Sequence, residues 1–517
     1  MSDSIKFTQQ NKVLLIIHDV YQEDNHFPLG PAYIAATLRD YGAFVETYCM
    51  DLFHYTNDEL EQKLQTDEYD LIGVGFMAAR FNETIRDLCS VINKNKKDAW
   101  LVLGGHGPSP IAEYILGETK ADVVVSGAGE ETTAELLDRK LKGSSIDDVL
   151  GITFFDGKNY IATPERPLLR KLDDNPLPAW DLFPIEEYSW SVKYFGADDH
   201  EKGLCFITGR GCSDKCAFCY RLEKGLRARS IPKVVEEIKI LYDRYGITAF
   251  YIMDDLFAFS TKRVLLFEKE LKDNGLTIKY GCDARVDHVI KDGSAMVESL
   301  KRSGCKFINL GLESSSNEVL ALMDKRATLE DNIKALDIVT GVGISIGLNF
   351  IWNNPGDTEK SLRDNVDLIK KYNDFMQLRT IRPVTPYPGS PLFYTAIEKG
   401  LLKGPGDFFD KFVNSDLILV NFTDLPLQKC YDLLLEANTE LINHHYQNTN
   451  GDMDEANRLI QDFSDLYSGK IKNFRGARHY DNKVQKNPTE RIGFSSTLAE
   501  EIKHAVPPAF PAVIAKV

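Results

Sequence analysis

Two long stretches of the 517-residue chain alternate short apolar runs with helical patterns, and this alternation restricts the possible folds more than any other feature. A short apolar run without alternating polar residues is typical of a strand that is buried on both faces. Such strands occur in parallel sheets whose two faces are covered by helices. The chain is therefore predicted to be an α/β protein.

The first stretch predicts a flavodoxin-like, Rossmann-type domain over residues 1–145. Helical patterns at 31–41, 82–93 and 130–141 separate five apolar runs of strand length, at 13–17, 44–50, 71–76, 100–105 and 122–127. In this architecture a ligand binds beyond the carboxyl ends of the strands. Glycines and other small residues follow several of the runs, where they either form turns or let a bulky ligand approach the backbone.

The second stretch predicts a partial, TIM-like (βα)6 barrel over residues 200–395, with its chemistry at the carboxyl ends of the strands. Helical patterns separate six expected strands, at 204–208, 249–253, 277–282, 306–312, 345–350 and 377–384. Five prolines between 164 and 184 predict an extended connector, which we assign to residues 146–199. Residues 396–517 are expected to be mostly helical, with an amphipathic helix at 425–447 and no clear pattern from 451 onward.

Composition and charge restrict the location and the partners of the protein. Hydrophobic residues make up 43% of the chain, which excludes a disordered protein. The 61 basic and 77 acidic residues give a net charge of −16, so no nucleic-acid partner is expected. No apolar run approaches the roughly 20 residues that span a bilayer, and the first residues lack the apolar core of a signal peptide. We therefore expect a cytoplasmic protein without a membrane partner.

Three of the nine cysteines, Cys212, Cys216 and Cys219, have the spacing CxxxCxxC directly after the first strand of the second stretch. Three thiolates on one short loop can hold three irons of a [4Fe–4S] cluster and leave the fourth iron open to a substrate or cofactor. Two alternatives stay open. A structural zinc site would need a fourth ligand, from Cys205 or a distant histidine, and buried thiols can also cluster without any metal.

This motif, with Phe218 before its last cysteine, resembles that of the radical S-adenosylmethionine (radical SAM) superfamily. The resemblance covers about residues 200–390 and includes the NPGDT turn that ends at 358 and the segment PYPGSPLF at 386–393. It implies a [4Fe–4S] cluster on the three cysteines and contacts to SAM from Phe218, Asp254, Asp255, Arg285 and Glu313. For the four charged residues, strand-end capping or simple ion pairing is the alternative.

The amino-terminal part resembles the module of cobalamin-dependent radical SAM enzymes, on FPLGPAYIAATLRDYG at 27–42, LGGHGPSP at 103–110, SGAGEETTAELL at 126–137 and PAWDLFP at 178–184. The resemblance implies cobalamin contacts from Gly75, Met77, Gly104, Gly105, His106, Gly127, Gly129 and Glu130. The DxHxxG motif of other cobalamin modules, whose histidine binds cobalt, is absent, because Asp24–Gly30 is one residue too long. His26 is therefore interpreted as a loop residue, and the lower axial ligand of cobalt is left open.

The resemblance favours a methyltransferase that moves a methyl group from methylcobalamin to an unactivated carbon through a 5′-deoxyadenosyl radical. Non-methylating cyclases and rearrangement enzymes are built from the same parts and remain an alternative. A non-catalytic sensor of corrin and cluster is the alternative of another class, although a sensor has little need of an open iron. The resemblance also implies a small-molecule substrate and an external one-electron reductant of the flavodoxin or ferredoxin type. No catalytic residue is named.

Overall fold

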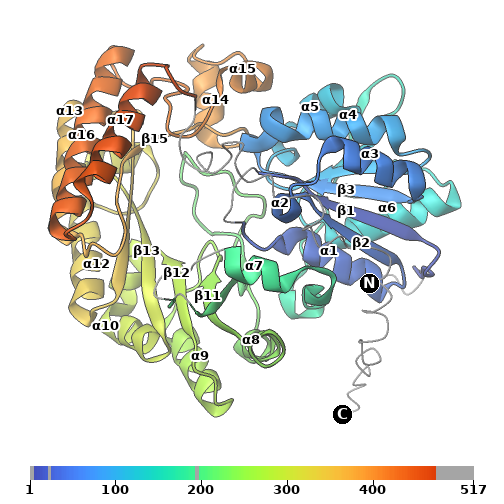
Figure 1. Ribbon diagram of the computed structural model, residues 1–517, viewed down its shortest axis with the longest axis horizontal. Coiled ribbons are helices and arrows are strands. Elements are labelled where there is room, and N and C mark those ends of the chain that lie inside the picture. The colour runs from blue at the N-terminus through green and yellow to red at the C-terminus, as the bar shows by residue number, and fades with distance from the viewer. Residues whose placement is uncertain (1–4, 21–24, 192–196, 199, 473–517) are drawn as a thin grey trace. The chain divides into compact units, whose positions relative to one another are not determined.

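The computed structural model describes residues 5–20, 25–191, 197–198 and 200–472. This part of the chain forms two mainly parallel sheets with helices packed against them (Figure 1). None of its helices is long and apolar enough to cross a membrane. The end of the predicted carboxyl-terminal region, from residue 473 onward, lies outside the described residues.

The first sheet confirms the predicted flavodoxin-like module. Its strand order is β2-β1-β3-β4-β5-β6-β7, and the first five strands are parallel. The order 2-1-3-4-5 is that of flavodoxin-like sheets, which bind ligands at their carboxyl edge. The five parallel strands are β1 (Lys12–Ile17), β2 (Phe44–Cys49), β3 (Leu71–Gly75), β4 (Trp100–Gly104) and β5 (Val123–Val125).

Two short strands that the sequence did not predict extend this sheet. They are β6 (Ile152–Phe155), which pairs antiparallel with β5, and β7 (Tyr160–Ala162), which pairs antiparallel with β6. Both lie within the residues that the sequence assigns to the connector. The rest of that segment contains the short helical pieces η4 (Leu172–Asp174), η5 (Trp180–Leu182) and α7 (Ile185–Ser191).

Helices cover both faces of the first sheet, as its buried strands require. The predicted helix at 82–93 begins as a π-helical turn and continues as a regular helix. The helical elements are α1 (Leu29–Asp40), α2 (Met50–Phe53), α3 (Asn57–Thr66), η1 (Ala78–Arg80), η2 (Phe81–Ile85), α4 (Arg86–Asn95), η3 (Ser109–Ile111), α5 (Ala112–Thr119) and α6 (Glu130–Lys142).

The second sheet confirms the predicted partial barrel. Its six strands are parallel, in the order β15-β14-β13-β12-β11-β8. The last strand spans only two residues, far fewer than the predicted 377–384. The strands are β8 (Lys202–Phe206), β11 (Ile247–Ile252), β12 (Lys279–Ala284), β13 (Cys305–Glu313), β14 (Ser345–Trp352) and β15 (Arg382–Pro383).

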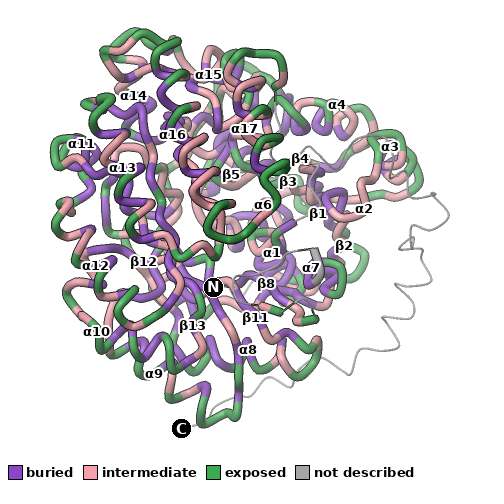
Figure 2. The backbone as a smooth tube through the Cα atoms, turned by 60° about the vertical axis from the view of Figure 1, so that its left-hand side comes forward, coloured by how far each residue is buried: buried purple, intermediate pink, exposed green. Residues whose placement is uncertain are grey.

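Helices separate the strands of the second sheet, close to the predicted positions. A small antiparallel hairpin lies between the first strand, β8, and the first helix. The hairpin pairs β9 (Gly209–Arg210) with β10 (Arg227–Ala228). The helices are α8 (Ile231–Tyr245), α9 (Thr261–Asp273), α10 (Val286–Arg302), α11 (Asn317–Leu322), α12 (Leu329–Val342) and α13 (Glu359–Tyr372). Figure 2 shows strands of both sheets as buried and many outer helical faces as exposed.

The described carboxyl-terminal residues are mostly helical, as predicted. They form α14 (Pro391–Glu398), α15 (Pro405–Lys411), α16 (Leu427–Asn448) and α17 (Met453–Tyr467). The sequence shows no clear pattern from 451 onward, yet residues Met453–Tyr467 form the regular helix α17. That helix buries Ala456, Phe463 and Leu466, which pack with Ile442 of α16.

Aromatic side chains join the connector to both sheets. Phe27, which precedes α1, lies 4.3 Å from Trp180 and 5.5 Å from Tyr188 between ring centroids. The indole of Trp180 donates a hydrogen bond of 3.0 Å to Glu237 of α8. Phe27, Trp180 and Tyr188 belong to one apolar cluster that continues into the second sheet. The connector is therefore part of the core as well as a link between the two sheets.

Candidate active site

A short loop carries the three cysteines between β9 and β10, beyond the carboxyl end of β8. It begins with Gly211, whose φ is +75°. A side chain there would place its Cβ 2.2 Å from the carbonyl oxygen of Gly225, so only glycine fits. Midway along the loop, the backbone N–H of Ala217 donates to Met323, and its carbonyl accepts from Leu392, both at 2.8 Å.

The three thiols lie in one electrostatic neighbourhood. Cys216 is buried, Cys212 is half-buried and Cys219 is exposed. Partial desolvation of the Cys219 thiol, and then the negative charges of Asp255 and the other two cysteines, raise its pKa to about 11. Desolvation also raises the pKa of Cys212. Iron binding at these thiols therefore has to release protons.

The donor set fits a cluster better than a single ion. The thiol of Cys212 has only a long contact, 3.8 Å to Asp214, and that of Cys219 one of 3.7 Å to a backbone carbonyl. Among the described residues, no group of three or more His, Cys, Asp or Glu side chains is arranged to hold one metal ion. Cysteines that each bind a different iron of a cubane do not converge on one point.

The two aspartates that follow β11 have different environments. Asp254 is buried, and its oxygens accept hydrogen bonds from the backbone N–H and the hydroxyl of Thr208, the former at 2.6 Å. Burial raises the pKa of Asp254 to about 6. Asp255 is exposed beside the cysteine loop. Of the two predicted SAM contacts, Asp255 is the one whose carboxylate is accessible to a ligand.

Arg285 and Glu313 both form buried ion pairs around the cysteine loop. Arg285 directly precedes α10 and lies 3.1 Å from Asp214, which belongs to the loop itself. Glu313 ends β13 with a φ of +65° and receives a hydrogen bond of 2.7 Å from Lys325. The ammonium of Lys325 also lies 6.0 Å from the ring centroid of Phe218. These contacts brace the loop; contacts of Arg285, Glu313 and Phe218 to SAM stay predictions.

The predicted cobalamin contacts lie at the carboxyl edge of the first sheet. Gly75 ends β3, and Met77, two positions later, has 57% of its surface exposed. Gly104 ends β4, followed by Gly105 and the exposed His106. A Cβ at Gly127 would meet nothing within 4 Å. Small and exposed residues at this edge fit a bulky flat ligand, whereas His26 is exposed in the loop before α1.

Two of the predicted cobalamin residues contact the barrel. Glu130, which begins α6, is buried and lies 2.6 Å from Arg210 of β9. The ring of His106 meets Tyr220 edge-on, with 6.1 Å between centroids, and His106 also interacts with the charge of Asp255. The carboxyl edge of the first sheet therefore faces the cysteine loop of the second.

Gly389 packs at this junction, and alanine there is expected to destabilise the protein. Its φ is +90°, and an added Cβ would lie 2.5 Å from Pro110 of the first module and 2.6 Å from Tyr220. Strain and overpacking together should cost about 2–4 kcal/mol, measured as a lower unfolding temperature. Gly400→Ala is the control, because Gly400 has a φ of +70° but open space around it. Equal effects of the two substitutions would contradict the packing argument.

Sequence reasoning missed several residues of this site. Arg210, Asp214, Thr208 and Lys325 make the polar contacts that hold the cysteine loop and the strand ends. Arg210 and Asp214 flank or interrupt the cysteine motif, which was the only available signal. Nothing in the sequence connects Lys325 with Glu313 or Thr208 with Asp254.

The family comparisons agree with this geometry. Residues 206–369 match the Radical SAM superfamily, and residues 19–137 match the B12 binding domain. An uncharacterized methyltransferase of Pyrococcus horikoshii is 29% identical over 72% of this chain and 79% of its own length. An anaerobic magnesium-protoporphyrin IX monomethyl ester cyclase of Rubrivivax gelatinosus is 26% identical over 74% of this chain and 69% of its own.

A solved structure shares the fold. The radical S-adenosylmethionine methyltransferase TsrM of Kitasatospora setae, bound to cobalamin and a [4Fe–4S] cluster, matches with a TM-score of 0.61. The match has 17% identity and covers 76% of this chain and 75% of that one. With both domains on one chain in this fold, the protein belongs to the cobalamin-dependent radical SAM enzymes. The cofactors of that class are a [4Fe–4S] cluster, SAM and cobalamin.

Proposed function

We propose that the protein transfers a methyl group, carried by cobalamin, to an unactivated carbon of a small molecule by way of a 5′-deoxyadenosyl radical. One observation carries the proposal: the carboxyl edge of the first sheet lies against the cysteine loop of the barrel. His106 of that edge contacts Tyr220 of the loop. A relative from Pyrococcus horikoshii and the similar structure from Kitasatospora setae are both named methyltransferases.

The residues of this chain have distinct roles in the proposal. Cys212, Cys216 and Cys219 hold the cluster, and Asp255 receives the amino group of SAM. Asp254 accepts a hydrogen bond from Thr208, which lies between β8 and β9, and so fixes the backbone that leads into the cysteine loop. When bound, the cluster supplies the electron that cleaves SAM, and cobalamin carries the methyl group. The electron comes from an external reductant of the flavodoxin or ferredoxin type.

The strand-end glycines and Met77 would line the side on which the corrin binds, and a bound corrin would cover them. A closed, water-poor space is what a carbon radical requires, because it limits side reactions.

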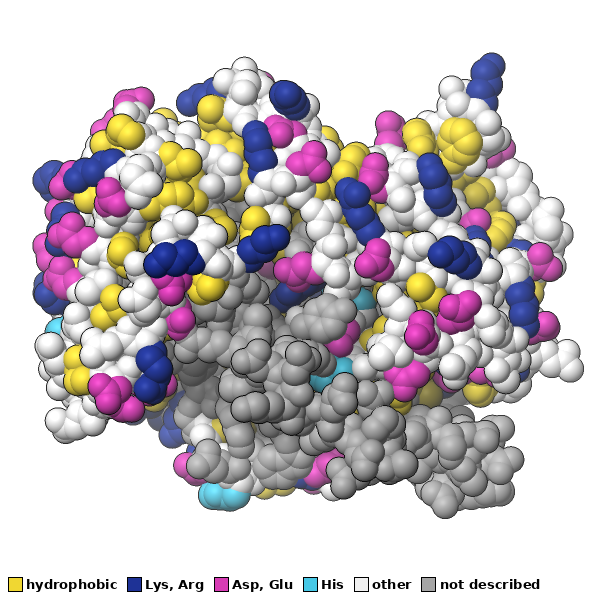
Figure 3. Space-filling view, turned by 45° about the horizontal axis from the view of Figure 1, so that its top comes forward, with side chains coloured by type: hydrophobic (Ala, Val, Ile, Leu, Met, Phe, Trp, Pro, Cys, Tyr) yellow, Lys and Arg dark blue, Asp and Glu magenta, His cyan; other side chains and the backbone are white. Residues whose placement is uncertain are grey.

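Figure 3 shows acidic and basic side chains interspersed over one face of the described protein.

The proposal is tested by anaerobic reconstitution of the full chain, followed by iron and cobalt counts and an absorption spectrum. We expect about four irons and one corrin per chain, together with formation of 5′-deoxyadenosine from SAM under a strong reductant. One zinc and no corrin would contradict the proposal. A full cluster and corrin without SAM cleavage would favour a sensor.

Oxidative cyclisation is the second candidate, and the similarity to the Rubrivivax gelatinosus cyclase is the observation that favours it. The two candidates differ in the fate of the methyl group of SAM. With methyl-labelled SAM, a methyltransferase incorporates the label into its product, whereas a cyclase leaves it in methionine.

A further inference from the structure

Residues of the first module hold the beginning of the cysteine loop. Arg210 comes two positions before Cys212 and lies 2.6 Å from Glu130, with 16% and 5% of the two side chains exposed. Its guanidinium also packs over the ring of Tyr33 in α1, 4.7 Å from the centroid. Glu223, 3.8 Å away, is its second acidic neighbour. A buried charge that loses its partner is strongly disfavoured, so this contact fixes where the loop begins.

The part of the loop directly after the third cysteine is held by the same module. Tyr220 directly follows Cys219, and its ring contacts His106. The side chain of Ser109 also interacts with the Tyr220 hydroxyl. Pro110 approaches from the same segment, since both it and Tyr220 lie against Gly389. The segment after β5 therefore contacts the chain just before the three cysteines, and the segment after β4 contacts it just after them.

We propose that Glu130 and Arg210 are positioning residues through which the cobalamin module sets the place of the cysteine loop. Glu130 then acts on the loop and not as a contact of the corrin. The inference rests on the proposed function only in taking the two bound cofactors to be a [4Fe–4S] cluster and cobalamin. The contact between Glu130 and Arg210 exists in the chain without them.

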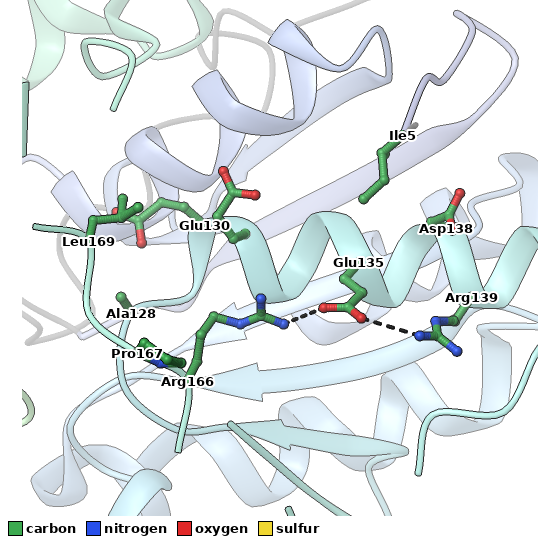
Figure 4. A pocket seen from close by; sticks show the side chains of 10 residues that line it. Ile5, Ala128, Glu130, Glu135, Asp138, Arg139, Arg166, Pro167 and Leu169 are labelled. Atoms are coloured by element: carbon green, nitrogen blue, oxygen red, sulfur yellow. Dashed lines mark hydrogen bonds and ion pairs between the residues drawn. The ribbon is translucent and has the colours of Figure 1, made fainter. Parts of the chain in front are cut away.

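Figure 4 shows the helix that offers a matched control. Glu130 begins α6 at one end of a cavity of about 490 Å³, and Glu135 lies about 1.4 turns further along the same helix. Glu135 pairs with Arg166 and Arg139, neither of which belongs to the cysteine loop. Glu135→Gln removes the same charge from α6 and leaves the link to the loop intact.

The first test uses the full chain without cofactors and measures the alkylation rates of individual cysteines by mass spectrometry. Cys216 is buried in the loop, and Cys430 is a buried reference in α16. E130Q is expected to raise the rate at Cys216 at least about tenfold, since a buried ion pair has been broken. The rate at Cys430 should not change, and E135Q should behave like the wild type. Unchanged labelling of Cys216 in E130Q would overturn the proposal.

E130D provides a milder variant, because it keeps the charge and shortens the side chain. It should label Cys216 more slowly than E130Q does but faster than the wild type does. If E130Q does not fold, E130D must still label Cys216 faster than the wild type does, and a wild-type rate in E130D would then overturn the proposal.

The second test uses the reconstituted protein and the magnetic interaction between the reduced cluster and cob(II)alamin in electron paramagnetic resonance spectra. E130Q should keep both cofactors but weaken their interaction, while E135Q keeps it. Loss of cobalamin from E130Q with unchanged labelling of Cys216 would make Glu130 a corrin contact and overturn the proposal. If the wild type binds neither cofactor, the proposed function fails, and the labelling rates still decide whether Glu130 positions the loop.

Discussion

Replacing Cys216 by alanine is expected to abolish the reductive cleavage of SAM. Cys216 is the buried member of the three, and the remaining two thiolates cannot hold a cubane with only one open iron. Because the electron reaches SAM only through the cluster, the formation of 5′-deoxyadenosine should fall by at least about a thousandfold. Iron content and chromatographic detection of 5′-deoxyadenosine after anaerobic reconstitution measure the effect.

Cys205→Ala is the matched control for this experiment. Cys205 lies in β8, buried, with its sulfur 3.6 Å from the carbonyl oxygen of Phe27. It is also one of the two candidates for the fourth ligand of a zinc site on this loop, beside a distant histidine. We expect C205A to retain the iron content and the activity of the wild type. Equal loss of metal in C205A and C216A would contradict the cluster and support a four-ligand site.

The two sheets were predictable because their strands are buried on both faces. The runs that form β1 and β3 contain almost no polar residues, so they can be recognised as buried strands from the sequence alone. The strands β6 and β7 were missed because they are short and lie at or next to the sheet edge. In β7, two of three residues are exposed, so no apolar run marks it.

The site was predictable only where residues are close in the sequence. The spacing of Cys212, Cys216 and Cys219 specifies one loop and one kind of ligand set. Asp254 and Asp255 look alike in the sequence, and the structure separates them because successive residues at a strand end point to opposite sides. The pairing of Glu130 with Arg210 joins two modules across 80 positions, and no local pattern encodes such a contact.

A buried carboxylate in the first module predicts an unusual pH dependence of stability. Asp51 lies in α2 with 3% of its surface exposed, and the hydroxyl of Tyr188 donates to it, 3.1 Å and 3.0 Å from its two oxygens. Burial raises the pKa of Asp51 to about 7, and the negative charge of Asp19 contributes, although the hydrogen bond from Tyr188 opposes the shift.

The direction of the effect follows from proton binding. In the unfolded chain the carboxyl has a pKa of 3.8, so between about pH 4 and pH 7 the folded state binds a proton that the unfolded state does not. Stability therefore falls as the pH rises through this window. With a folded-state pKa of about 7, the loss at pH 8 is on the order of 4 kcal/mol.

Asp51→Asn removes this loss, because the amide oxygen still accepts the hydrogen bond from Tyr188 and never ionises. We expect D51N to be more stable than the wild type at pH 8, with the difference shrinking toward pH 5, as measured by unfolding temperatures. Asp148→Asn is the control: Asp148 is exposed, and its hydrogen bond with Arg139 lowers its pKa. Its difference from the wild type should not vary over this range. Parallel curves for D51N and the wild type would show that Asp51 is ionised in the folded protein throughout, and that the surrounding polar groups, Tyr188 first among them, compensate its burial.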